Sequence, residues 1–223
     1  VSGSMKKNDP ANLRVPALKL LTNLLPKGSP AGVWLFGEKV EPLVAWKPVD
    51  KAWQQSALAA SNRIHYRGLF TNIGDAIAAT SFGWDKPDLH TKRSIILLTD
   101  GMLDVSKAPG KNEVARRKLM DADLPQLKAS GAVIHTIALS READAELLGK
   151  LSGATDGWFQ SAEKAEDLQR IFLKIFEQAT ARDSLPLANN RFKVDASIEE
   201  FTLLAFRKSD STPTTLIAPG GKS

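Results

Sequence analysis

Ser94-Ile95-Ile96-Leu97-Leu98-Thr99-Asp100-Gly101 is the stretch that decides the fold. Its apolar residues run without interruption and end at turn-forming residues, a pattern typical of a strand buried on both faces of a parallel sheet. Asp100 follows the last residues of this strand, so its carboxylate is expected at the carboxyl end of the sheet. Residues 94–98 are therefore predicted to form a central parallel strand.

The flanking sequence predicts strands that alternate with helices. Further strands are expected at residues 33–36, 43–46, 133–139 and 158–159, and helices at 10–25, 50–63, 72–82, 112–130, 141–152 and 163–179. Gly37-Glu38-Lys39 is typical of a hairpin turn, and Pro125 is expected to break the helix that contains it. The alternation predicts an α/β fold with a doubly wound, mostly parallel, Rossmann-like sheet flanked by helices.

The pattern changes after residue 180. Residues 192–197, 201–206 and 214–218 show the alternation of β-strands, and no helical segment separates them. Consecutive strands without crossover helices predict antiparallel β-structure. We therefore expect two parts: an α/β domain at residues 1–180, and a linker with β-strands at residues 181–223 that begins a β-sandwich-like domain.

Four side chains offer oxygen atoms to a cation. They are the hydroxyls of Ser2, Ser4 and Thr71 and the carboxylate of Asp100. Hard oxygen donors from separate loops suit Mg²⁺ or Ca²⁺ rather than zinc, which prefers nitrogen and sulfur. Ligands of open α/β sheets bind at the carboxyl ends of the strands, where Asp100 is predicted to lie.

Each of these groups taken alone has an ordinary structural explanation. Ser2-Gly3-Ser4 could be a flexible polar terminus, Thr71 the N-cap of the helix that starts at Asn72, and Asp100 the turn residue of an Asp-Gly pair. Their joint occurrence in this order favours the metal site. Asp75 is expected to stabilise a helix N-terminus, Asp104 to be a solvated residue on the rim, and His135 to be a core residue rather than a zinc ligand.

Composition excludes several classes of function. The 223 residues include no cysteine, so disulfides and thiolate metal sites are excluded. The net charge of +5 is mild and contains no dense block of Lys and Arg, so we expect no specific nucleic-acid binding. No apolar run is long enough to span a bilayer. No Gly-x-Ser-x-Gly elbow, phosphate-binding loop or dinucleotide fingerprint occurs, and no histidine is obviously paired with Asp100, so we expect no enzyme activity.

Three segments together resemble the von Willebrand factor type A (VWA) domain. They are Val1-Ser2-Gly3-Ser4-Met5, Phe70-Thr71-Asn72-Ile73-Gly74 and Leu98-Thr99-Asp100-Gly101. The resemblance covers about residues 1–180 and implies a metal-ion-dependent adhesion site (MIDAS). It implies that Ser2 and Ser4 bind the cation directly, and that Thr71 and Asp100 bind it directly or through water. The cation would be Mg²⁺, or Mn²⁺ or Ca²⁺.

The sequence departs from the family pattern at one position. The pattern is Asp-x-Ser-x-Ser, and its aspartate would directly precede Val1. The strand that carries this aspartate is central in the family's sheet. A sheet without it would leave backbone groups unpaired, so we expect upstream residues to belong to the protein. Without the aspartate, Asp100 is the one carboxylate left for the cation, and we expect weakened affinity.

The resemblance implies a non-enzymatic, adhesion-type binding module. A protein ligand presenting an Asp or Glu carboxylate would complete the cation's coordination. Residues after 180 resemble the β-sandwich that follows VWA domains in several bacterial envelope proteins, which implies a periplasmic or extracellular location. The alternative is a cytoplasmic accessory subunit of an ATPase complex, and a metal-assisted hydrolase is a third reading.

Overall fold

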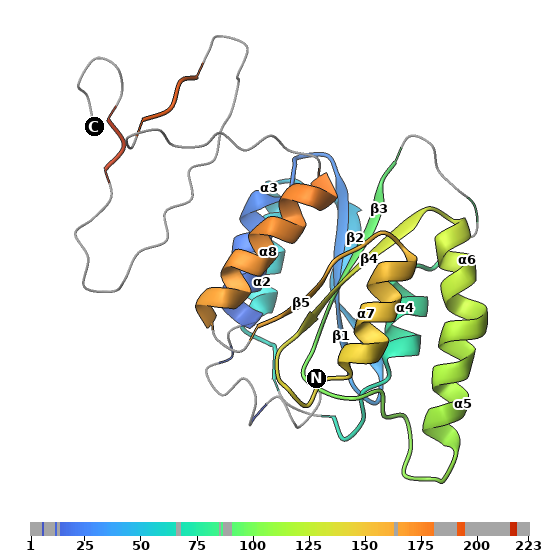
Figure 1. Ribbon diagram of the computed structural model, residues 1–223. Coiled ribbons are helices and arrows are strands. Elements are labelled where there is room, and N and C mark those ends of the chain that lie inside the picture. The colour runs from blue at the N-terminus through green and yellow to red at the C-terminus, as the bar shows by residue number, and fades with distance from the viewer. Residues whose placement is uncertain are drawn as a thin grey trace. The chain divides into compact units, whose positions relative to one another are not determined.

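The computed structural model describes residues 6, 12, 14–65, 68–84, 86, 91–162, 165–180, 191–194 and 215–217. The chain divides into two compact units, Val1–Ser184 and Leu185–Ser223. All the helices and strands named below lie in the first unit (Figure 1). In the described part of the chain, no helix is both long enough and apolar enough to cross a membrane.

A three-stranded parallel sheet forms the centre of the first unit. It comprises β3 (Arg93–Thr99), β4 (Ala132–Ala138) and β5 (Phe159–Ser161), in the order β3-β4-β5. Along β3 the side chains alternate between two cores. Ile95 and Leu97 belong to the larger one, and Ile96 and Leu98 pack against a second. This alternation confirms the prediction that the apolar run is a parallel strand buried on both faces. Its predicted central position is not seen among the described residues, where β3 pairs with β4 alone and stands at one end of the order β3-β4-β5.

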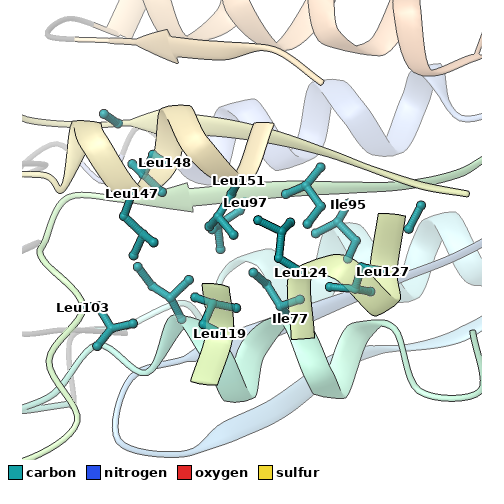
Figure 2. Packing of buried hydrophobic residues seen from close by; sticks show 14 of the residues in the cluster. Ile77, Ile95, Leu97, Leu103, Leu119, Leu124, Leu127, Leu147, Leu148 and Leu151 are labelled. Carbon is teal, nitrogen blue, oxygen red and sulfur yellow. The ribbon is translucent and has the colours of Figure 1, made fainter. Parts of the chain in front are cut away.

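Helices cover both faces of this sheet (Figure 1). The larger core joins it to α4 (Ile73–Thr80), α5 (Lys111–Lys118), the π-helix η1 (Leu119–Asp123), α6 (Leu124–Ala129) and α7 (Ala145–Ala154). Figure 2 shows leucines of α6, α7 and η1 meeting Ile95 and Leu97 of β3. The second core joins it to α2 (Arg14–Leu24) and α8 (Ala165–Thr180). The expected α/β architecture with a helix-flanked parallel sheet is thus present.

An antiparallel hairpin forms a second, two-stranded sheet. Its strands are β1 (Pro30–Phe36) and β2 (Val40–Pro48), and the turn between them lies at residues 37–39, as predicted. Helix α3 (Lys51–Ser61) packs on the hairpin through Trp53. Among the described residues, β1 pairs with β2 alone and is not hydrogen-bonded to β3.

Two helix predictions need correction. The helix predicted at residues 10–25 begins at Arg14, because the backbone of Asn12 has a φ of 53°, which a right-handed helix cannot contain. The helix containing Pro125 is not broken. Its backbone widens into the π-helical turn Leu119–Asp123, in which the N–H of Leu124 donates to the carbonyl of Leu119. This widening accommodates a proline that would otherwise clash with the preceding turn.

The remaining helix predictions are confirmed with small shifts at their ends, and the last helix, predicted from residue 163, is described at Ala165–Thr180. The segment predicted at 141–152 starts at Ala145, because Asp144 caps it and residues 141–143 form a turn. The β-strands predicted after residue 190 fall mostly outside the described residues. Within them, 192–194 and 215–217 are not in strands.

His135 is a core residue, as predicted. Its side chain on β4 is 1% exposed, and its Nδ1 accepts a hydrogen bond of 3.2 Å from the backbone N–H of Trp158. Burial lowers the pKa of this imidazole from its ordinary value. Both facts favour the neutral ring, since a proton on Nδ1 would remove the acceptor.

We therefore expect the free energy of unfolding to fall as the pH falls below about 6.5, the ordinary pKa of histidine. The unfolded chain binds a proton there that the folded chain does not, so acid favours unfolding. Urea denaturation at pH 7.5, 6 and 5 measures the effect. His135→Asn, whose amide oxygen can still accept the Trp158 N–H, should flatten this dependence. The exposed His65, changed to Asn, is the control. An unchanged slope in His135→Asn would contradict the assignment.

Candidate functional site

Loops from three strands meet at the carboxyl ends of the parallel strands. The backbone N–H of Asn72, just before α4, donates to the carbonyl of Gly37 in the hairpin turn at 3.1 Å. The hydroxyl of Ser140, after β4, donates to the backbone carbonyl of Asp100, after β3, at 2.7 Å. The first bond ties the segment before α4 to the turn that follows β1, and the second joins the loops that follow β3 and β4. The carboxyl ends of β3 and β4 form the edge at which ligands bind in open α/β sheets.

Asp100 lies immediately after β3 and is only 1% exposed. The residue next to it, Gly101, accepts a backbone hydrogen bond from Asp144 at 3.4 Å. A buried carboxylate needs hydrogen-bond donors or a cation nearby, so Asp100 is more than an exposed turn residue. Its position agrees with the prediction from sequence.

Thr71 is brought to the same loop by a pair of backbone hydrogen bonds with Asp104. The N–H of Thr71 donates to the Asp104 carbonyl at 2.7 Å, and the N–H of Asp104 donates to the Thr71 carbonyl at 3.1 Å. Thr71 is 5% exposed. Its hydroxyl offers a neutral oxygen of the kind that Mg²⁺ and Ca²⁺ bind.

Thr71 does not cap α4, so the alternative reading of this residue is wrong. The cap is Asn72, whose Oδ1 accepts the N–H of Asp75 at 3.0 Å and whose Nδ2 donates to the Asp75 carboxylate at 2.6 Å. This reciprocal pair confirms that Asp75 stabilises the helix N-terminus. It also leaves the hydroxyl of Thr71 without a capping role.

Asp104 is half-buried rather than a solvated rim residue, which corrects the prediction. Its carboxylate accepts a hydrogen bond from the Asn112 side chain at 3.0 Å. Sequence reasoning did not single out Asn112, because its partners lie six to eight residues away across a loop. No local sequence signal marks such a bond.

Asp144 and Arg116 are further residues of this region that sequence reasoning missed. Asp144 is 5% exposed, caps α7 by accepting the N–H of Leu147 at 3.0 Å, and is ion-paired with the guanidinium of Arg116 on α5. The Asp-Ala-Glu sequence at the start of α7 is a usual N-cap signal and could have identified Asp144. Arg116 is 28 residues away and carries no such signal.

An open cleft of about 630 Å³ lies beside the loop that follows β3. It is lined by loop residues 102–104, 106 and 107, by Asn112, Glu113 and Arg116 of α5, and by Asp144. Met102 at the edge of this loop is 56% exposed. A partner bound at the end of the sheet would have both apolar and charged groups to contact here.

The donor set fits a cation held by oxygen atoms. Nowhere in the described residues do three His, Cys, Asp or Glu side chains gather into a metal-binding group. A site here would therefore combine the Asp100 carboxylate with hydroxyl oxygens such as that of Thr71, which suits Mg²⁺ and Mn²⁺. The other two predicted ligands, Ser2 and Ser4, lie outside the described residues, so their placement stays a prediction.

No protein-family model matches this chain, and no curated protein matches it. Solved structures do. A von Willebrand factor type A protein from Catenulispora acidiphila has a TM-score of 0.64 at 18% identity, over 82% of this chain and 42% of that one. Proximal thread matrix protein 1 from the mussel byssus, in a structure with a zinc-occupied MIDAS motif, has a TM-score of 0.57 at 19% identity, over 80% and 43%.

BatB from Bacteroides thetaiotaomicron, a conserved hypothetical protein, has a TM-score of 0.52 at 14% identity, over 82% of this chain and 96% of that one. The chain thus spans less than half the length of the first two proteins and nearly all of the third. At these identities the likeness concerns the fold alone.

Proposed function

We propose that this chain, which has the VWA fold, is a non-enzymatic protein-binding module that engages its partner through a divalent cation. Asp100 and Thr71, together with Ser2 and Ser4, hold the cation. An Asp or Glu carboxylate of the partner protein completes its coordination. The location we propose is the periplasm or the cell exterior, on the resemblance of the residues after 180 to envelope proteins.

One observation carries this proposal. A buried carboxylate and an almost buried hydroxyl, predicted as ligands from separate segments of sequence, are brought to one loop junction by the Thr71–Asp104 hydrogen bonds. Both lie at the sheet edge where α/β proteins bind ligands. The likeness in fold to a mussel protein whose MIDAS motif holds zinc supports a cation site on this fold.

Charge explains why such a site would bind a carboxylate. A divalent cation held by one protein carboxylate and several neutral hydroxyls keeps a net positive charge. An acidic group from outside removes this excess charge and displaces water. In this arrangement Asp100 is the one negatively charged ligand that the protein gives to the cation. Thr71 gives a neutral oxygen, which helps to position the cation without adding charge.

The proposal predicts that Mn²⁺ binding depends on Asp100. Calorimetric titration should show weak binding to the chain, with a dissociation constant on the order of 1 mM, because few charged ligands are present. Asp100→Ala and Thr71→Val should each weaken binding at least about tenfold. An aspartate placed directly before Val1 should tighten it by a similar factor.

Matched variants distinguish the loss of a cation ligand from a general change in charge or stability. Asp121→Ala and Thr91→Val change exposed residues of the same types and should leave binding unchanged. Melting curves of all variants check that the fold is kept. Equal Mn²⁺ affinity in Asp100→Ala and Asp121→Ala, or no binding even with the added aspartate, would refute the proposal.

A further inference from the structure

Asn112 binds the loop that follows β3 through both ends of its side-chain amide. Its Oδ1 accepts the backbone N–H of Val105 at 2.8 Å and that of Ser106 at 3.2 Å. Its Nδ2 donates to the Asp104 carboxylate at 3.0 Å. Three bonds from one half-buried side chain at the start of α5 fix three consecutive loop residues.

The loop fixed in this way also determines where Thr71 lies. Asp104 exchanges both backbone hydrogen bonds with Thr71, at 2.7 and 3.1 Å. A continuous path of hydrogen bonds therefore runs from Asn112 through Asp104 to the backbone of Thr71. Asn112 does not belong to the set of proposed cation ligands.

We infer that Asn112 is the positioning residue of the candidate cation site, holding the Thr71 hydroxyl in place through Asp104. The predicted effect of Asn112 on cation affinity rests on the proposed function. The predicted effect of Asn112 on the position of Thr71 rests on the hydrogen bonds alone. A ligand oxygen must stay within a few tenths of an ångström of its place for Mg²⁺ or Mn²⁺, because the coordination geometry of a small cation is strict. Supporting residues around metal ligands serve this purpose.

The geometry predicts a local effect that needs no cation. Asn112→Ala should speed hydrogen exchange of the Thr71 and Asp104 amides at least about tenfold, because the loop opens more often once its side-chain bonds are lost. The amides of β3 and β4 should exchange as in the parent chain. Asn23→Ala, an exposed asparagine on α2, is the matched control and should change none of these rates.

A pair of variants at Asp104 isolates the hydrogen bond from charge. Asp104→Asn and Asp104→Ala both remove the carboxylate charge, but the asparagine keeps an oxygen that can accept the Asn112 N–H. Thr71 should exchange at nearly the parent rate in Asp104→Asn and about tenfold faster in Asp104→Ala. Mn²⁺ affinity should follow the same order, falling about tenfold in Asn112→Ala with little change in melting temperature.

The two measurements separate this inference from the proposed function. Faster exchange at Thr71 with weaker Mn²⁺ binding supports both. Faster exchange in a chain whose parent form binds no Mn²⁺ supports the positioning by Asn112 and refutes the cation site. Unchanged exchange at Thr71 in Asn112→Ala overturns the inference, whether or not the chain binds the cation.

Discussion

Gly157→Ala is expected to lower the free energy of unfolding by about 3 kcal/mol, the upper range for a group forced into a packed interior. Gly157 lies between α7 and β5, beside β4. A Cβ built there would stand 2.0 Å from the carbonyl oxygen of Ile134 and 2.7 Å from its carbonyl carbon. Both are backbone atoms of a strand paired on each side, so no side chain can move aside to make room.

The surrounding hydrogen bonds keep Gly157 from moving instead. Its N–H donates to the carbonyl of Ser152 at 2.9 Å, and the next residue, Trp158, is bonded to Thr136 and His135 on β4. Gly153→Ala is the matched control, because no atom lies within 4 Å of its added methyl group. Gly153 lies in the last turn of α7, where alanine should stabilise the chain by up to about 0.5 kcal/mol. Urea denaturation of both variants measures the difference, and equal stabilities would contradict the close approach.

Asp144→Ala is expected to lower the free energy of unfolding by about 2 kcal/mol, the sum of a lost helix cap and a broken ion pair. The carboxylate caps α7 through Leu147 and binds the guanidinium of Arg116. Arg116 is 34% exposed, so water screens part of the ion pair and the cap supplies the larger share. The backbone N–H of Asp144, which alanine keeps, donates to Gly101 beside Asp100. Loss of the cap should let the start of α7 move and so loosen the candidate site through this bond.

Asp144→Asn separates these two contributions. An asparagine oxygen caps a helix as well as an aspartate does, but it carries no charge for Arg116. We expect Asp144→Asn to lose about 1 kcal/mol or less. Thermal or urea denaturation at low and high salt measures both variants. Added salt should reduce the ion-pair part of the loss in both variants, so that at high salt a clear loss remains only in Asp144→Ala. Equal losses in the two variants would show that the ion pair, and not the cap, is the main contribution.

Sequence patterns predicted the main elements of this fold for a local reason. The uninterrupted apolar run of residues 95–98 requires burial on both faces, and burial on both faces is what a parallel strand between two helix layers provides. The hairpin turn at 37–39 and the helices were predicted from equally local signals. Element ends were predicted less well, because single backbone angles, such as that of Asn12, decide them.

Thr71 and Asp100 were selected as cation ligands by their residue types and order. The structure shows Asp100 directly after β3 and the backbone of Thr71 bonded to Asp104 of the same loop, and their binding of a cation stays a prediction. Asp104 was expected to be solvated and is instead half-buried and hydrogen-bonded. Ser2, Ser4 and most residues of the predicted β-segment lie outside the described residues, so those predictions stay as they were.

The sequence by itself determined which residues are apolar, that residues 94–98 lie in a strand and that a carboxylate follows it. Those properties depend on residue type and on neighbours within a few positions. Only the tertiary structure decided that Asp104 pairs with Thr71, that Asn112 holds their loop and that Gly157 must lack a side chain. Each of these depends on close contacts between residues that are not neighbours in the chain, from six residues apart in the loop of Asn112 to 33 for Thr71 and Asp104, and such contacts arise only when the elements pack.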